Sequence, residues 1–311
     1  MSKKITPKWY IGVLLLVVVL LFFFFAAIPM QMNWGMWGLA LTQIGLLLIA
    51  LAVPILFKWK LGEVLPIKKI TAKQFFGTLL LYIASFILVN TVTMITAYFF
   101  PGMLEVGNAL GNFFTSVPFV MAFIIIAVMP GICEEILFRG VILHTLRTIK
   151  NPLIIMLIVG LLFGLFHLDV YRFLPTAILG FVLTYLMLTT GNFLLPVFFH
   201  FLNNAVSVTI SFGSFGSGAE IDAEAIVGLE EIGLEVIGVY LILLAVAPVL
   251  YFFAGRLLNP ERKNKKDKFA VIILTVLLFF SGIGLFALNI DLDTILMNVP
   301  ETVAVSLLSR Q

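Results

Sequence analysis

Apolar runs long enough to cross a bilayer recur along almost the whole chain, and they constrain its fold more than any other feature. A membrane-spanning helix needs about 20 mostly apolar residues. Of the 311 residues, 62% are hydrophobic and only 11% are charged, which leaves too little polar surface for a water-soluble domain. Because backbone polar groups in lipid must be satisfied within the chain, the sequence predicts an all-α, polytopic membrane bundle of eight or nine helices.

The predicted spans are separated by loops that carry turn residues or charge clusters. The first apolar run is too long for the core of a signal peptide and lacks a clear cleavage site, so we expect it to remain as a membrane helix. The nine predicted spans are residues 11–29, 36–57, 75–100, 117–148, 153–167, 173–190, 193–212, 236–258 and 269–288. The predicted parts are N-terminal helices at 1–116, a catalytic membrane core at 117–212, an acidic extracytoplasmic loop at 213–235, and C-terminal helices with a tail at 236–311.

The distribution of charge predicts a multi-pass protein of the cell membrane with a cytoplasmic N-terminus. Lysine and arginine are enriched in the cytoplasmic loops of membrane proteins. In this orientation the basic loops 58–73 and 256–268 fall inside, and the acidic stretch 220–235 falls outside. Arg172 falls on the wrong side, which indicates that its connection is buried in protein. The basic loops are most simply topology determinants, although a cytosolic basic patch can also bind anionic lipid.

Ionisable residues interrupt some of the most apolar sequence, in the stretch from Met129 to His167. Such groups cost about 2.5–3.5 kcal/mol each at membrane depth, so they mark a candidate functional site. Glu134 and Glu135 are adjacent and point about 100° apart on a helix, so they cannot serve the same purpose. Glu135 lies four residues before Arg139, a spacing and order that favour an ion pair. Glu134 is therefore the carboxylate left free for chemistry.

A predicted helical hairpin brings His167 to Glu134. The turn signal Asn151-Pro152 lies midway between the two residues, so antiparallel arms of roughly 24 Å each would bring them level. Gly160 and Gly164 form a small-xxx-small face that favours close packing of the second arm against a neighbour. We therefore expect Glu134 and His167 to meet inside the membrane.

A second histidine lies on a later helix, where His200 and Asn204 share one face at i, i+4 spacing. Asn203, at i+3, satisfies the same geometry, so spacing alone does not choose between the asparagines. Counting 1.5 Å per residue does not bring His200 level with His167 unless the intervening helices are tilted or broken.

These residue types together indicate hydrolysis by activated water. A buried glutamate beside a histidine can bind and deprotonate a water molecule. A second histidine and a carboxamide can donate hydrogen bonds to the oxyanion that forms when water attacks a peptide carbonyl. The hairpin and the charge distribution favour a position of Glu134 nearer the cytoplasmic side, with cytosolic or lateral access for the substrate.

The order of the motifs resembles the type II CAAX prenyl endopeptidases and their bacterial, Abi-related relatives, the CPBP intramembrane proteases. EExxxR corresponds to residues 134–139, FxxxH to residues 163–167 and HxxxN to residues 200–204. The similarity covers roughly residues 117–212. EExxxR alone is a weak signal, but the ordered set of three motifs is specific.

The resemblance implies a role for each matching residue. Glu134 and His167 would activate water, while His200 and Asn204 would line the oxyanion hole. It thus favours Asn204 over Asn203. Glu135 and Arg139 would be structural or substrate-contacting. The substrate would be a membrane-associated peptide or protein, with a prenylated CAAX protein as one option.

Two other hydrolytic mechanisms are compatible with parts of the sequence. Glu134, His167 and His200 would suffice as a two-histidine, one-carboxylate zinc set, but the chain has no HExxH helix. We therefore expect no metal and no other cofactor, with zinc as the alternative. A nucleophilic role for Cys133 is less favoured, since no base is placed beside it. This single cysteine is most simply a small buried hydrophobe.

Two alternatives lie outside the hydrolases. Intramembrane carboxylates and histidines also build proton relays in transporters, but the sequence has no repeated halves of the kind that many transporters contain. Relatives of the resembled family are associated with bacteriocin immunity, so a non-catalytic, peptide-binding membrane protein is the other alternative. Nucleic acid is not an expected partner, because lysine and arginine lie in short juxtamembrane clusters.

Overall fold

The computed structural model describes residues 7–215, 232–261 and 266–288, and these residues form helices and connecting turns without a β-strand. The predicted all-α membrane bundle is confirmed. The predicted acidic loop falls mainly on residues 216–231, and the C-terminal tail on residues 289–311, so both lie outside the described residues. The helices are α1 (Trp9–Phe22), η1 (Phe23–Ala27), α2 (Ile28–Leu56), α3 (Leu61–Val64), α4 (Ala72–Phe99), α5 (Gly102–Thr115), α6 (Phe119–Ala122), η2 (Phe123–Val128), α7 (Met129–Glu135), η3 (Ile136–Ile142), α8 (Leu143–Thr145), α9 (Pro152–Phe166), α10 (Phe173–Thr190), α11 (Leu194–Phe215), α13 (Leu234–Leu244), α14 (Ala247–Leu258) and α15 (Lys266–Leu288).

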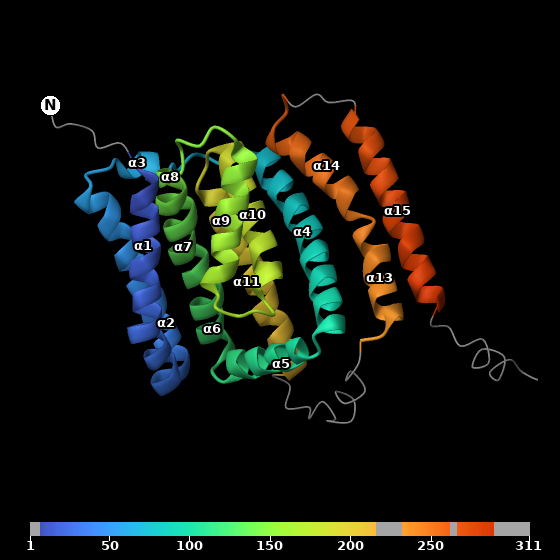
Figure 1. Ribbon diagram of the computed structural model, residues 1–311, viewed down its shortest axis with the longest axis horizontal. Coiled ribbons are helices and arrows are strands. Elements are labelled where there is room, and N and C mark those ends of the chain that lie inside the picture. Colours follow the sequence, from blue (N-terminus) through green and yellow to red (C-terminus); the bar gives the residue numbers. More distant parts are fainter. Residues whose placement is uncertain (1–6, 216–231, 262–265, 289–311) are drawn as a thin grey trace, which may run out of the picture.

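Within these described ranges, seven helical segments are long and apolar enough to cross a membrane. The lower number than the eight or nine predicted has two causes. The predicted first and second spans belong to one helical segment of 48 residues, Trp9–Leu56, and α9 has only 15 residues. Both regions nevertheless provide helices that run along the bundle in Figure 1.

The 48-residue segment folds back on itself at Gly35. The Gln31 side chain donates a hydrogen bond to the Thr42 hydroxyl at 3.1 Å, although a straight helix would separate these residues by about 16 Å. Gly35 has φ 51° and ψ −124°, a conformation outside the helical region. Glycine reaches this region without a Cβ penalty. The reversal makes α1 and most of α2 an antiparallel pair, which corresponds to the two predicted spans 11–29 and 36–57.

Two short helices were not predicted. The connection between the predicted third and fourth spans, residues 101–116, contains the 14-residue helix α5. This helix lies across one end of the bundle, the α5 end, almost at right angles to the other helices (Figure 1). Its glycine and asparagine content and its polar face fit a helix at the membrane surface. The other, α3, lies at the opposite end, next to the basic loop that follows α2 (Figure 1).

The helices that carry the motifs occupy the middle of the bundle, between the α1–α2 pair and the C-terminal helices (Figure 1). Small residues allow α9 and α10 to approach closely. A Cβ atom at Gly160 would lie 2.8 Å from the backbone oxygen of Ala177, and one at Gly164 would lie 2.7 Å from that of Phe173. The small-xxx-small face predicted on this helix therefore packs against α10.

The reversal at Gly35 predicts a specific sensitivity to substitution. A Cβ at this position would have open space around it, so Gly35→Ala should act through backbone strain alone. We expect it to lower the free energy of unfolding by about 1–3 kcal/mol, measured by denaturant titration in detergent. Gly284→Ala is the matched control, because Gly284 also has open space but lies within α15 and has no positive φ. Equal stability of the two variants would contradict this account of the turn.

Candidate active site

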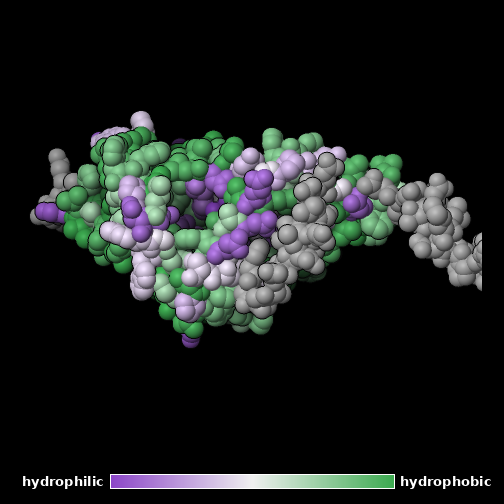
Figure 2. Space-filling model, turned by 90° about the horizontal axis from the view of Figure 1, so that it is seen from below, coloured by the Kyte–Doolittle hydropathy of each residue, from purple (hydrophilic) through white to green (hydrophobic). Residues whose placement is uncertain are grey.

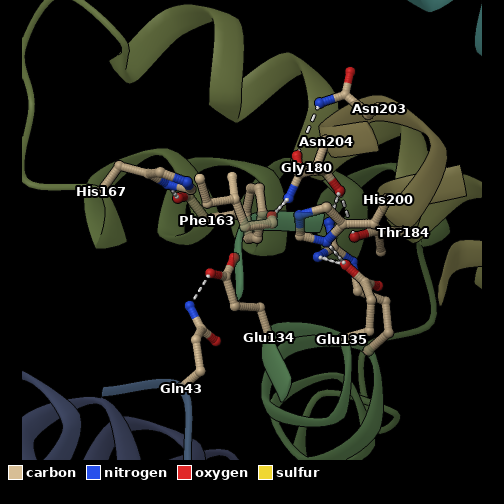
Figure 3. A network of polar contacts seen from close by, with 12 residues as sticks. Gln43, Glu134, Glu135, Phe163, His167, Gly180, Thr184, His200, Asn203 and Asn204 are labelled. Carbon is tan, nitrogen blue, oxygen red and sulfur yellow. Dashed lines mark hydrogen bonds and ion pairs between the residues drawn. The ribbon is translucent and has the colours of Figure 1, made fainter. Parts of the chain in front are cut away.

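Glu134 lies near the end of α7, a short α-helical segment between two π-helical segments, η2 and η3. π-Helical turns often occur at functional sites, since they alter the direction of nearby side chains. Glu134 is 6% exposed. Its Oε1 accepts a hydrogen bond from Gln43 Nε2 at 3.0 Å, which leaves Oε2 directed toward the space beside His167 and His200 (Figure 3).

His167 follows the last residue of α9 and is half-buried. Its Nδ1 lies 2.8 Å from the backbone oxygen of Phe163. Because a carbonyl oxygen only accepts, Nδ1 carries the proton in a neutral ring and Nε2 keeps a free lone pair. A water molecule between this nitrogen and Glu134 would meet two hydrogen-bond acceptors.

Phe163 holds both histidine rings at the same site. Its ring centroid lies 5.0 Å from that of His167 and 5.7 Å from that of His200, in edge-on arrangements. His200 therefore reaches the level of the other motifs, which residue counting along regular helices did not predict.

Glu135 is fully buried and organises the second half of the site. Its Oε1 accepts hydrogen bonds from Arg139 at 2.9 Å and from His200 Nδ1 at 2.8 Å. Arg139 also donates to the backbone oxygen of Gly180 on α10 at 2.8 Å, and its guanidinium lies 4.6 Å from the Phe163 ring centroid. The carboxylate thus fixes the His200 ring while the arginine ties the motif helix to α10.

Asn204 is directed toward this site from α11 (Figure 3). One N–H of its side-chain amide donates to the backbone oxygen of Ile126 at 3.0 Å. Its Oδ1 accepts a hydrogen bond from Asn203 at 3.2 Å. These two contacts orient the amide and leave its second N–H for another acceptor, whereas Asn203 acts as a support for Asn204.

A basic side chain lies at the loop end of the site. Arg172 precedes α10 and is close enough to Glu134 and Asp169 to interact with them electrostatically. Burial lowers the pKa of the Arg172 guanidinium, and the two carboxylates act in the opposite direction. Asp169 also accepts hydrogen bonds from the backbone N–H groups of Tyr171 and Arg172, at 2.9 and 3.2 Å, so the loop has a defined shape. The sequence-based expectation that this connection is buried in protein is wrong, because Arg172 is only half-buried and Leu168 and Val170 are exposed.

The space beside the site lies toward the α5 end of the bundle. Figure 2, which views this end, shows hydrophilic residues gathered around a hollow in the middle of a mostly hydrophobic face. The loop after His167 reaches the same level, because a Cβ atom at Gly102 of α5 would lie 2.9 Å from the Tyr171 hydroxyl. The lysine-rich end of the bundle, where the basic loop 58–73, the end of α14 and the start of α15 lie, is the opposite end (Figure 1).

Sequence reasoning missed Gln43 and the Gly180 carbonyl. Gln43 was detectable in principle, since it is a buried polar residue within an apolar span and such residues are costly in a membrane. Its partner was not predictable, because the contact joins residues 91 positions apart. The Gly180 carbonyl is a backbone group, for which no residue type gives a signal.

Two features bear on the alternative hydrolytic mechanisms. Among the described residues, no group of three or more His, Cys, Asp or Glu side chains is arranged to hold a metal ion. Cys133 is buried, whereas reactive cysteines are partly exposed and lie in electropositive surroundings. The absence of a metal requirement stays a prediction, to be tested by chelation.

Fold and site together define a multi-pass membrane protein with a buried centre of acidic, histidine and amide side chains. A family model described as type II CAAX prenyl endopeptidase Rce1-like matches residues 116–206. The match confirms the resemblance to the CAAX protease family over this segment, which contains all three motifs. It gives no support to a role in bacteriocin immunity. No curated protein and no solved structure matched the chain.

The Glu135–Arg139–His200 cluster predicts a large loss of stability on removal of the guanidinium. Arg139→Met would leave a buried carboxylate without its main cationic partner, so we expect it to lower the free energy of unfolding by about 3–5 kcal/mol, measured by denaturant titration in detergent. Arg147→Met is the control. Arg147 is exposed, and an exposed charge contributes at most about 1 kcal/mol. A similar small effect of both variants would contradict the structural role of Arg139.

Proposed function

We propose that the protein is an intramembrane endopeptidase that hydrolyses a peptide bond with water activated by Glu134. The observation that carries the proposal is the arrangement of this carboxylate. One oxygen is held by Gln43, and the other faces the space beside His167, whose hydrogen bond to Phe163 leaves Nε2 as an acceptor. Membership of the matched segment in a family of membrane peptidases supports the same reaction.

In this proposal a water molecule binds between the Glu134 carboxylate and His167. Glu134 takes a proton as the water oxygen attacks the carbonyl carbon of the substrate. The same proton then passes to the leaving nitrogen, which breaks the peptide bond. General acid–base catalysis of this kind contributes about 10²–10⁴-fold to the rate.

His200 and Asn204 are proposed to stabilise the oxyanion. Asn204 has one amide N–H uncommitted after its bond to Ile126. His200 donates Nδ1–H to Glu135, so its Nε2 can donate to the oxyanion only when the ring is protonated. The proposed role therefore requires the cationic ring, with Glu135 as its partner at 2.8 Å. Two such donors in a site that excludes water stabilise developing negative charge strongly.

The proposed substrate is a membrane-associated peptide or protein segment, and prenylation of that segment is one option consistent with the family description. The reaction as proposed uses no metal or other cofactor. Zinc is the alternative, in which Glu134 and the two histidines would be ligands. Two further alternatives are not hydrolases. A peptide-binding protein would use the same site to bind a peptide without cleaving it. A proton-coupled transporter would need a path for its substrate through the protein.

We further propose that the substrate enters from the α5 end. The hollow with hydrophilic residues lies at this end (Figure 2), and the lysine-rich loops lie at the other. If the lysine-rich loops are cytoplasmic, as their charge favours, entry is from the extracytoplasmic side. This proposal replaces the expectation of cytosolic or lateral access, which rested on the predicted hairpin and the charge distribution.

The function is tested by cleavage of a panel of quenched fluorescent peptides, including a farnesylated CAAX peptide, by detergent-purified protein. We expect Glu134→Gln to lower kcat/KM by about 10²–10⁴-fold and a chelator to have no effect on the wild type. Glu105→Gln is the matched control, because Glu105 is an exposed glutamate on α5 and should leave cleavage unchanged.

Each outcome of this assay favours one reading. Activity lost on chelation and restored by zinc would replace the glutamate mechanism with a metalloprotease. Full activity of Glu134→Gln would overturn the role of this residue. Binding of a peptide by both forms without cleavage, in folded protein, would favour the binding-only alternative.

The entry side is tested by cysteine labelling in intact bacterial cells that express the chain. In a Cys133→Ala background, we expect Glu105→Cys on α5 to react with a membrane-impermeant maleimide, and Lys60→Cys at the other end to react only after permeabilisation. Both replaced side chains are exposed in the native protein, so accessibility within the fold is matched. The reverse pattern would place the hollow on the cytoplasmic side.

A further inference from the structure

A cavity of about 490 Å³ lies between α4, α10, α14 and α15. It is separate from the catalytic site, since it is lined by the α10 residues Ile178, Phe181 and Tyr185, whereas Gly180 and Thr184 of the same helix face the motif helices. Its volume falls within the range of about 300–1,000 Å³ that is usual for ligand pockets. The proposed peptidase reaction makes no use of it.

The cavity exists because α14 and α15 diverge. Near the α5 end, α15 packs closely on α13, and a Cβ atom at Gly238 or Gly282 would lie 2.7 Å from the backbone oxygen of the other residue. Beyond the break at Ala245–Val246, α14 instead packs on α4, where a Cβ atom at Gly77 would lie 3.0 Å from Leu257. Figure 1 shows the resulting separation of α14 from α15 toward the lysine-rich end.

The chemistry of the lining is that of a lipid site. The walls are almost entirely apolar, and the Tyr251 hydroxyl is already bonded to Ser85 at 3.1 Å. A water molecule needs two to four polar partners, so water is not a suitable occupant. In a bilayer, the available apolar occupant is an acyl chain. From Pro248 to Arg256 the wall is about 12 Å long, which accommodates part of such a chain.

The lining of the cavity includes one basic side chain, that of Arg256, which lies at its mouth. Arg256 is exposed at the last turn of α14 and lies 4.8 Å from the Phe252 ring centroid. None of the described residues accepts a hydrogen bond from its guanidinium or forms a salt bridge with it. Lys268, also exposed, begins the opposite wall on α15. Arginine binds phosphate through two parallel hydrogen bonds, and this end of the helices is where lipid headgroups would lie.

We propose that this cavity is a specific site for an anionic phospholipid, with one acyl chain between α10, α14 and α15 and the phosphate bound by Arg256. The site would select lipids by the negative charge of the headgroup and would surround one acyl chain with protein. It is therefore distinct from the general contact of α15 with the bilayer, which covers its mostly exposed outer face.

The test uses full-length protein stripped of lipid by detergent exchange and then titrated with phosphatidylglycerol or with phosphatidylcholine of the same acyl chains. Native mass spectrometry counts the lipids bound to each molecule. For the wild type we expect one phosphatidylglycerol that binds about tenfold more tightly than phosphatidylcholine, because both headgroups carry a phosphate but the choline cation would lie beside Arg256 and be repelled by it. Arg256→Gln should remove this preference.

Two tryptophan substitutions separate the cavity from the outer surface of α15. Val271→Trp fills the cavity, because Val271 lines it, and should abolish the tight phosphatidylglycerol site. Ile272→Trp is the matched control on the adjacent, 60% exposed residue, and should retain the site. The melting temperature without added lipid reports whether each variant is folded. Equal binding by all three proteins, or equal loss in both tryptophan variants, would overturn the proposal. Neither readout depends on peptide cleavage.

Discussion

The centre of this structure depends on one buried carboxylate, that of Glu135. A charge with no exposed surface inside an apolar bundle is costly unless it is paired and hydrogen-bonded. The partners it needs come from different parts of the chain, Arg139 from its own helix and His200 from α11. Arg139 in turn requires an acceptor, which the Gly180 carbonyl on α10 provides. Three helices are thus held in one arrangement by the requirement to satisfy one ion pair.

This arrangement gives the two adjacent glutamates different surroundings. Glu135 is fully buried, and its Oε1 is bonded to both Arg139 and His200, so this oxygen is not available to water. Glu134, one residue earlier, is directed away from that cluster and is held by a neutral donor, Gln43. This hydrogen bond orients the Glu134 carboxylate, and in the proposed reaction the carboxylate takes up a proton from water. The two adjacent carboxylates therefore differ in their hydrogen-bond partners, which is the basis of the different roles proposed for them.

Much of this could be predicted from the sequence because the signals were local or strongly periodic. Apolar runs gave the membrane helices, and the i, i+4 spacing of Glu135 and Arg139 gave their ion pair. Residues that act through distant contacts were not predictable, as with Gln43. Departures from regular geometry were also missed: the π-helical segments around α7 and the surface helix α5. Counting along regular helices also did not bring His200 level with His167, and the roles of the individual site residues remain predictions.

The two sides of α10 show how one helix can serve two environments. One side packs closely on α9, since a Cβ atom added at Gly180 would lie 3.0 Å from the Cα of Gly160. On the same side, the Gly180 carbonyl accepts a hydrogen bond from Arg139. This close packing excludes lipid from the charged centre. An acyl chain between the two helices would separate Arg139 from its acceptor, the Gly180 carbonyl. The other side carries Phe181 and Tyr185 and faces the apolar cavity. Because small residues lie on the first side and large apolar residues on the second, the same helix seals the polar site and leaves room for lipid behind it.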